Sequence, residues 1–323
     1  MKPAFSVIFL TTLIGAAQGL LLALFGAELR GLWGLQAPPQ GAPFYTVGAT
    51  LVLLLAGLGL GSSFFHLGRP ERAWRSAAMW RTSWLSREVI VLPAFMAAVF
   101  LYALAHYALA VLEPAAAPTS RITFALGSIS GLLAGALFVC TGMIYACLPF
   151  LREWHSPLTV INYTVLGSAS GFILAGALSA RLASELSGFF TACALVLTLL
   201  GWLFRGLSLW RNQRLRPKST IQTAIGIKHP HIVQKSAGFL GGSFNTREFF
   251  HGQGASVMQA VKWAFLLLVF ALPALLLAVA LDTKAFGLLA WIFGLQYLGL
   301  LGERWYFFAQ AQHPQNHYYQ AIR

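Results

Sequence analysis

Residues Val89–Leu112 read VIVLPAFMAAVFLYALAHYALAVL, an apolar stretch of 24 residues without Asp, Glu, Lys or Arg. An α-helix needs about 20 such residues to cross the hydrocarbon core of a bilayer. The rest of the chain is similar, since hydrophobic residues make up 58% of its 323 residues and charged residues only 10%. A soluble domain carries about 25% charged residues because its surface faces water. The sequence therefore excludes an ordinary soluble protein and predicts an integral membrane protein.

Seven further apolar segments lie between the charged residues and are long enough to cross a membrane. With Val89–Leu112 they give eight predicted transmembrane spans: 5–25, 44–65, 89–112, 122–147, 158–180, 186–204, 263–281 and 285–302. The predicted fold is thus an all-α integral membrane bundle of eight helices, a single anchor domain over residues 1–323. Two long loops, 66–88 and 205–262, fall on the same side, and the second joins the sixth and seventh helices.

The basic residues divide unevenly between the two sides of this bundle. The side with both termini and both long loops carries 18 of the 22 Lys and Arg residues, and the other side carries four. Cytoplasmic loops are enriched in Lys and Arg. We therefore expect both termini in the cytoplasm of a bacterial inner membrane. The net charge of +13 is explained by this topology, and no nucleic acid is expected as a partner.

Small residues at helical spacing predict close packing between the spans, because glycines one turn apart let two helix backbones approach. Such spacing occurs at Gly15/Gly19, Gly57/Gly61, Gly127/Gly131/Gly135 and Gly167/Gly171. Packing within one bundle is the simplest role for them. The three cysteines form no C-x-x-C pair, so neither a disulfide framework nor a cysteine metal site is predicted.

The ionisable residues limit the chemistry that the membrane part can perform. A haem needs axial ligands from facing helices, yet His106 is the only histidine within a predicted span. Transporters of charged solutes keep ionisable groups at mid-membrane depth, whereas Glu28, Glu88 and Glu303 fall near span ends. These patterns disfavour a haem protein, a proton pump and a charged-substrate transporter. They favour a lipophilic ligand with a polar head, bound at one interface.

A polar segment after the second predicted span fits such a ligand. Its His66 titrates near neutral pH and is suited to exchange a proton with a quinone carbonyl, Glu88 is suited to relay that proton, and Trp74 is suited to flank the ring. Arg69 and Ser86 complete the predicted quinone site. Three other roles stay open: His66 hydrogen-bonded to backbone, arginines that anchor lipid headgroups, and Ser86 as the N-cap of a helix with Glu88 in its first turn.

A second hypothesis concerns a short motif that occurs twice. Residues 83–88 read SWLSRE, and residues 243–248 read SFNTRE. In both, a hydroxyl, a cation and a carboxylate open a helical turn on the same face, so we expect the two segments to lie together as a docking surface. The candidate docking residues are Arg72, Arg75, Arg247 and Glu248.

These motifs resemble the anchor-subunit family of dimethyl sulfoxide reductase, to which the membrane subunit of quinone-linked sulfite dehydrogenase is similar. The resemblance rests on the first nine residues, on HLGRP at 66–70, on SWLSRE at 83–88 and on NTREF at 245–249, and it extends over nearly the whole chain. The related polysulfide-reductase type fits these motifs less well. The resemblance places the family's histidine after the second span at His66 and its acidic residue at the start of the third span at Glu88.

The resemblance also implies a complex. The chain would be a third subunit without haem or iron–sulfur cluster of its own, bound to a ferredoxin-like iron–sulfur subunit that contacts a molybdopterin catalytic subunit. An exchangeable quinone or quinol would react at the anchor, and no catalytic residue for the terminal substrate is expected on this chain. The direction of electron flow stays open. A structural anchor without a quinone site and a transporter of a neutral or lipophilic solute are the alternatives.

Overall fold

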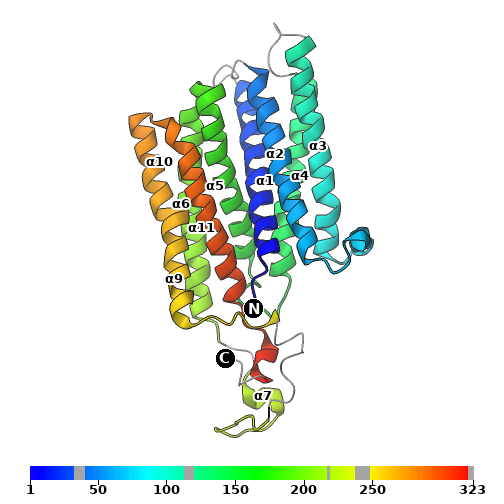
Figure 1. The fold of residues 1–323 in the computed structure, drawn as a ribbon, viewed down its shortest axis with the longest axis vertical. Coiled ribbons are helices and arrows are strands. Elements are labelled where there is room, and N and C mark those ends of the chain that lie inside the picture. Colours follow the sequence, from blue (N-terminus) through cyan, green and yellow to red (C-terminus); the bar gives the residue numbers. More distant parts are fainter. Residues whose placement is uncertain (33–40, 113–119, 217–218, 237–247, 319–323) are drawn as a thin grey trace.

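The computed structural model describes residues 1–32, 41–112, 120–216, 219–236 and 248–318. Within them, eight helical segments are long and apolar enough to span a membrane, and they run side by side along one axis (Figure 1). This confirms the predicted all-α bundle of eight spans. The first six are α1 (Phe5–Leu32), α2 (Ala42–Ser63), α3 (Trp84–Leu112), α4 (Arg121–Ala146), α5 (Pro157–Leu182) and α6 (Ser187–Gln213). The seventh span joins α9 (Ala255–Phe265), the π-helical η4 (Leu266–Ala271) and α10 (Leu272–Thr283), and the eighth is α11 (Leu289–Ala309).

The short elements are unevenly distributed between the two ends of the bundle. One end holds the N-terminus, the last described residues and the projecting α7 (Figure 1), and we call it the loop-rich end. Its short helices are η1 (Phe64–His66), η2 (Pro70–Met79), α7 (Ile221–Ile225) and η6 (Pro314–Tyr318). The opposite end has the single-turn helices η3 (Ser184–Leu186) and η5 (Phe286–Leu288).

The loop between the sixth and seventh spans is shorter than the sequence predicted. Helix α6 continues to Gln213 and α9 begins at Ala255, so the connection covers 214–254 instead of 205–262. The prediction ended the sixth span before Arg205, because a charged residue usually marks the edge of an apolar segment. In the structure Arg205 is buried and the helix continues past it.

Helix α1 is the most buried span, with 72% of its apolar segment covered by neighbouring helices. It packs closely on α5, where an added Cβ at Gly171 would overlap the backbone of Gly19 and one at Gly19 would lie 2.8 Å from Ser168 Cα. The predicted packing role is therefore confirmed for the glycine pairs of α1 and α5. Gly57 and Gly61 have no neighbouring atom within 4 Å of an added Cβ among the described residues, so their spacing has no comparable role there.

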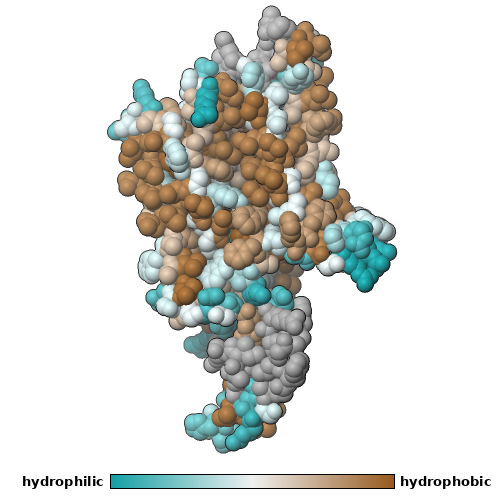
Figure 2. All heavy atoms as spheres, viewed as in Figure 1, coloured by the Kyte–Doolittle hydropathy of each residue, from teal (hydrophilic) through white to brown (hydrophobic). Residues whose placement is uncertain are grey.

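The outer surface of the bundle agrees with a membrane environment. Large apolar side chains face outward along the helices, including Trp291 at 80% and Leu132 at 76% exposure. In Figure 2 the hydrophobic residues cover the length of the bundle, and the hydrophilic ones gather at its two ends and on the projecting η2 segment. The chain is thus a multi-pass membrane protein whose polar chemistry lies near the helix ends.

Candidate functional site

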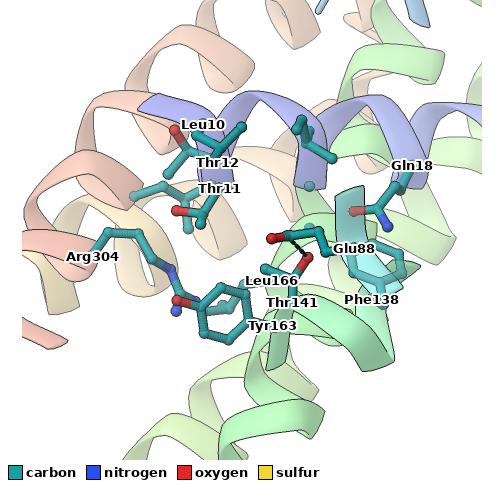
Figure 3. Close-up of a pocket in the computed structure, with 14 residues that line it drawn as sticks. Leu10, Thr11, Thr12, Gln18, Glu88, Phe138, Thr141, Tyr163, Leu166 and Arg304 are labelled. Carbon is teal, nitrogen blue, oxygen red and sulfur yellow. Dashed lines mark hydrogen bonds between the residues drawn. The ribbon is translucent and has the colours of Figure 1, made fainter. Parts of the chain in front are cut away.

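Glu88 lies about one turn into α3 at the loop-rich end and is 9% exposed. The hydroxyl of Thr141 on α4 donates a hydrogen bond of 2.5 Å to Glu88 Oε1 (Figure 3). Helix α3 begins at Trp84, and the hydroxyl of Ser83 accepts the backbone N–H of Ser86 at 3.4 Å. Ser83, and not Ser86, therefore occupies the N-cap position of α3. Ser86 lies inside the helix and is buried.

A cavity of about 20 Å³ lies beside Glu88, enough for about one water molecule. Five helices contribute to its wall, and Figure 3 shows Glu88 and Arg304 both directed toward it. The apolar part of the wall includes Leu10, Ile14, Phe138, Leu166 and Leu300, and the polar part includes Thr11, Thr12, Gln18, Glu88, Thr141, Tyr163 and Arg304. The cavity thus places a carboxyl and a guanidinium in one enclosed, mostly apolar space.

Arg304 belongs to a buried ionic triad. The Glu303 carboxylate lies between two guanidinium groups, with Oε1 at 2.7 Å from Arg205 Nε and Oε2 at 3.0 Å from Arg304 Nε. None of the three side chains is more than 5% exposed. The Arg304 guanidinium also lies 3.9 Å from the centre of the Tyr163 ring, a cation–π contact. The triad therefore joins α6 and α11 and extends to α5.

A second cavity of about 10 Å³ borders this triad. Arg205, Glu303 and Arg304 line it together with Glu153 and Arg211. The Arg211 guanidinium donates hydrogen bonds to the Arg152 carbonyl at 3.1 Å, which ties α6 to the segment between α4 and α5. Arg304 lines both cavities, so the polar groups beside Glu88 continue toward the loop-rich end.

Of the five residues predicted for the quinone site, Glu88 alone lines the first cavity within the described part of the chain. His66 ends η1 and is exposed, and so is Arg69 just before η2. Trp74 on η2 is 71% exposed. The structure therefore separates an exposed group, His66, Arg69 and Trp74, from the buried Ser86 and Glu88. The reason is local: η1 and η2 contribute no buried residue, whereas α3 turns Ser86 and Glu88 into the bundle.

The predicted docking residues are likewise exposed where the structure describes them. Arg72 pairs with its neighbour Glu71 at 3.7 Å, and Arg75 lies 5.5 Å from the ring centre of Trp74. The backbone carbonyl of the exposed Glu248 accepts the N–H of Lys2 at 2.9 Å. Arg247 lies outside the described residues. Glu88 is buried while Glu248 is exposed, so the carboxylates of the two motifs have different surroundings.

The sequence does not predict the triad, because charged residues usually mark the end of a span. The predicted sixth and eighth spans end at residues 204 and 302, just before Arg205 and Glu303. Helix α11 continues to Ala309, and α6 to Gln213, so all three residues lie within helices. The adjacent Glu303 and Arg304 at the end of an apolar segment were the available signal, since ionisable residues in spans usually pair inside the bundle.

A second buried polar cluster lies near the opposite end. Glu28 is 1% exposed, and its carboxylate accepts hydrogen bonds from Thr123 at 2.7 Å and Tyr102 at 3.1 Å. His106 is fully buried and stacks on Tyr45, with ring centres 4.4 Å apart. No partner for His106 was evident from the sequence, and the structure places Tyr45 and Tyr102 against it. These contacts join α1, α2, α3 and α4.

The fold and the polar groups define a class of protein: a membrane bundle of eight spans with a buried carboxyl and an ionic triad near its loop-rich end. Residues 1–308 match the family model described as DMSO reductase anchor subunit (DmsC). The chain is also 53% identical over 325 residues to a sulfite dehydrogenase subunit from Allochromatium vinosum, and the alignment covers all of both chains. The chain therefore belongs to the DMSO reductase anchor subunit family, as its motifs predicted, and is an anchor subunit of an oxidoreductase complex.

Proposed function

We propose that this chain is the quinone-reactive membrane anchor of a molybdopterin oxidoreductase complex of the dimethyl sulfoxide reductase or sulfite dehydrogenase type. It binds an exchangeable quinone or quinol and passes electrons between that molecule and an iron–sulfur partner subunit. The terminal substrate reacts on the molybdopterin subunit. The loop-rich end faces the cytoplasm of a bacterial inner membrane, an orientation that the many Lys and Arg residues of its loops support.

The observation that carries this proposal is the buried carboxyl of Glu88 near one membrane interface. Quinone reduction takes up two protons and quinol oxidation releases two, so the site needs a group that exchanges protons away from bulk water. Glu88 is such a group, and the hydroxyl of Thr141 holds its carboxyl at the cavity. Ionisable residues placed inside a membrane are usually functional.

The dimensions of the cavity support a ring site outside it. A space of about 20 Å³ accommodates about one water molecule and excludes an aromatic ring. We therefore place the quinone ring at the rim, beside His66, Arg69 and Trp74. Exposed apolar side chains there, including Phe65 at 90% exposure, offer a surface for the ring at the edge of the lipid. Ser86 and Glu88 lie deeper, and Glu88 exchanges the proton through the cavity.

The partner subunit docks on the loop-rich end, where the exposed cations Arg72 and Arg75 lie near the proposed ring site. We propose a role in docking for Arg247 and Glu248 as well. Electrons then travel directly between the quinone and the partner, so the anchor needs no haem or cluster of its own. The name of the sulfite dehydrogenase relative supports the sulfite type.

The test uses the assembled complex in membranes and compares His66→Ala and Glu88→Gln with Glu28→Gln. Glu28 is the matched control because its carboxyl is also buried and also accepts a hydroxyl hydrogen bond, but near the opposite end. We expect all three complexes to assemble, and the first two to lose quinone-dependent turnover or quinone-analogue binding at least tenfold. Unchanged turnover and binding in both variants would show a structural anchor without a quinone site.

A further inference from the structure

The triad of Arg205, Glu303 and Arg304 contains two cations and one anion, all deeply buried. Its net charge is therefore +1 in a part of the bundle from which water is largely excluded. An uncompensated buried charge is strongly unfavourable unless another charge balances it. The stability of the triad alone does not explain the second arginine, because one arginine suffices to neutralise Glu303.

Arg304 lines both cavities, and among the described residues Glu88 is the carboxylate on the wall of the first. Glu153 lies on the wall of the second cavity together with Arg211, whose charge it offsets. Figure 3 shows both side chains, Glu88 and Arg304, at the same cavity, with Tyr163 beside Arg304. When Glu88 is ionised, the triad and Glu88 together are neutral. When Glu88 is protonated, the group carries one positive charge.

We propose that the triad is the counter-charge for ionised Glu88, with Arg304 acting as a positioning residue that sets the pH at which Glu88 releases its proton. The inference rests on the proposed function. For each quinone reduced to quinol, two electrons arrive from the redox group of the partner subunit and two protons arrive from the loop-rich side. Glu88 delivers one of these protons, is ionised while the quinol occupies the site, and is reprotonated after the quinol leaves. The reverse holds for quinol oxidation, in which Glu88 accepts the proton.

Among the described residues, the other polar and ionisable groups near Glu88 do not supply a competing counter-charge, so we assign this role to Arg304. Arg87, on the same helix, donates its hydrogen bonds to the carbonyls of Trp80 and Arg81 at the surface. Helix α2 contributes no Asp, Glu, Lys, Arg or His. The other groups facing Glu88 are uncharged at neutral pH: Thr11, Thr12 and Gln18 on α1, Cys140, Thr141 and Tyr145 on α4, and Tyr163 on α5.

Two substitutions in the triad have opposite expected effects on the pH profile of quinone-dependent turnover. Arg304→Gln removes a positive charge, makes ionised Glu88 less favourable and moves the Glu88-dependent midpoint to higher pH. Glu303→Gln removes a negative charge and moves the midpoint to lower pH. Each shift is expected to be about one pH unit, the order of magnitude for a change of one unit charge nearby at an effective dielectric constant of about 20. General damage to the bundle does not produce shifts of opposite sign.

The experiment uses the assembled complex and includes three further variants. Arg304→Lys keeps the charge and is expected to keep the midpoint, Glu28→Gln lies near the opposite end and leaves it unchanged, and Glu88→Gln removes the midpoint altogether. Shifts of both triad variants in the same direction, or no shift in either, would overturn the inference. If the wild-type midpoint persists in Glu88→Gln, the proton role of Glu88 in the proposed function fails instead.

Where a single variant does not assemble, the double variant Arg205→Gln/Glu303→Gln removes one charge of each sign and keeps Arg304. The three positions of this double variant carry the same net charge as the wild-type triad. We therefore expect the midpoint of the pH profile to stay at its wild-type value. A shift of about one pH unit in this double variant would contradict the counter-charge role, because the net charge has not changed.

Discussion

Thr141 on α4 donates a hydrogen bond of 2.5 Å to the buried carboxyl of Glu88 on α3. This contact joins two neighbouring helices at the point where a carboxyl borders the cavity shared with Arg304. A buried carboxyl without a hydrogen-bond partner is strongly unfavourable. The hydroxyl of Thr141 therefore stabilises the position of Glu88 and fixes the direction in which Glu88 faces the cavity.

We predict that Thr141→Val destabilises the protein by about 1–3 kcal/mol, because it leaves a buried carboxyl oxygen without its donor. Quinone-dependent turnover should fall as well, since Glu88 is no longer held at the cavity. Thermal unfolding of the purified complex measures the first effect. Thr164→Val is the matched control, because the Thr164 hydroxyl donates its hydrogen bond to the Val160 carbonyl of its own helix, at 3.1 Å. Equal losses in both variants would contradict the specific role of Thr141.

A second prediction concerns the contact between α1 and α5. Gly171→Ala places a Cβ within the backbone of Gly19, so the two helices must separate. We expect a loss of about 1–3 kcal/mol or more from overpacking, and a lower yield of folded protein. Gly57→Ala has open space around the new methyl group and should leave stability nearly unchanged. A thermal-stability assay in detergent compares the two, and similar stabilities would show that the close approach is unimportant.

The fold could be predicted from the sequence only in part. The spans could be predicted because each has enough apolar residues to cross the membrane, and the packing of Gly19 on Gly171 follows from glycine spacing. The ends of the helices could not be predicted in the same way, because the rule that charged residues stop a span fails where charges pair. Arg205 and Glu303 pair inside the bundle, from helices nearly one hundred residues apart in the chain.

The site shows the same division. Glu88 was predicted from its place at the start of the third span, and the structure puts it in a cavity. Its neighbours Thr141, Tyr163 and Arg304 come from three other helices, and nothing local in the sequence connects them. His66 and Trp74 were grouped with Glu88 because they are close in sequence, but η1 and η2 project them toward the surface.

A third prediction concerns the buried cluster around Glu28. Tyr102→Phe removes one of the hydroxyls that donate to the Glu28 carboxylate, at 3.1 Å, and keeps the ring that packs against His106. We expect a loss of about 1–3 kcal/mol in stability, because hydrogen bonds to carboxylates are stronger than neutral ones. Quinone-dependent turnover measured in the same preparation should be unchanged. A large loss of turnover in a Tyr102→Phe complex that keeps wild-type stability would show that the cluster around Glu28 takes part in the quinone reaction.

A fourth prediction concerns pH and the segment beyond α11. The His313 ring stacks on Phe249 with ring centres 3.8 Å apart and lies edge-on to Phe150 at 5.6 Å. Burial lowers the pKa of His313 below its usual value of 6.5. The unfolded segment then binds a proton more readily than the folded one, so the packing weakens as the pH falls below about 6.5.

Hydrogen exchange of residues 248–254 and 310–318 measured at neutral and mildly acidic pH tests this. We expect faster exchange at the acidic pH in the wild type, and a smaller pH effect in His313→Phe, which retains an aromatic ring without a titrating group. Burial also lowers the pKa of His251, so part of the pH effect should remain. An identical pH effect in His313→Phe and the wild type would show that His313 does not control this packing.

The central claim is that Glu88 changes its protonation state when the quinone is reduced or oxidised. Redox-induced infrared difference spectroscopy of the assembled complex measures this directly, because a protonated carboxyl has its own C=O stretching band. We predict a carboxyl band that appears or disappears with the redox state of the quinone, that is absent in Glu88→Gln and that is retained in Glu28→Gln. A difference spectrum without any band that depends on Glu88, in a complex that still turns over quinone, would contradict the claim.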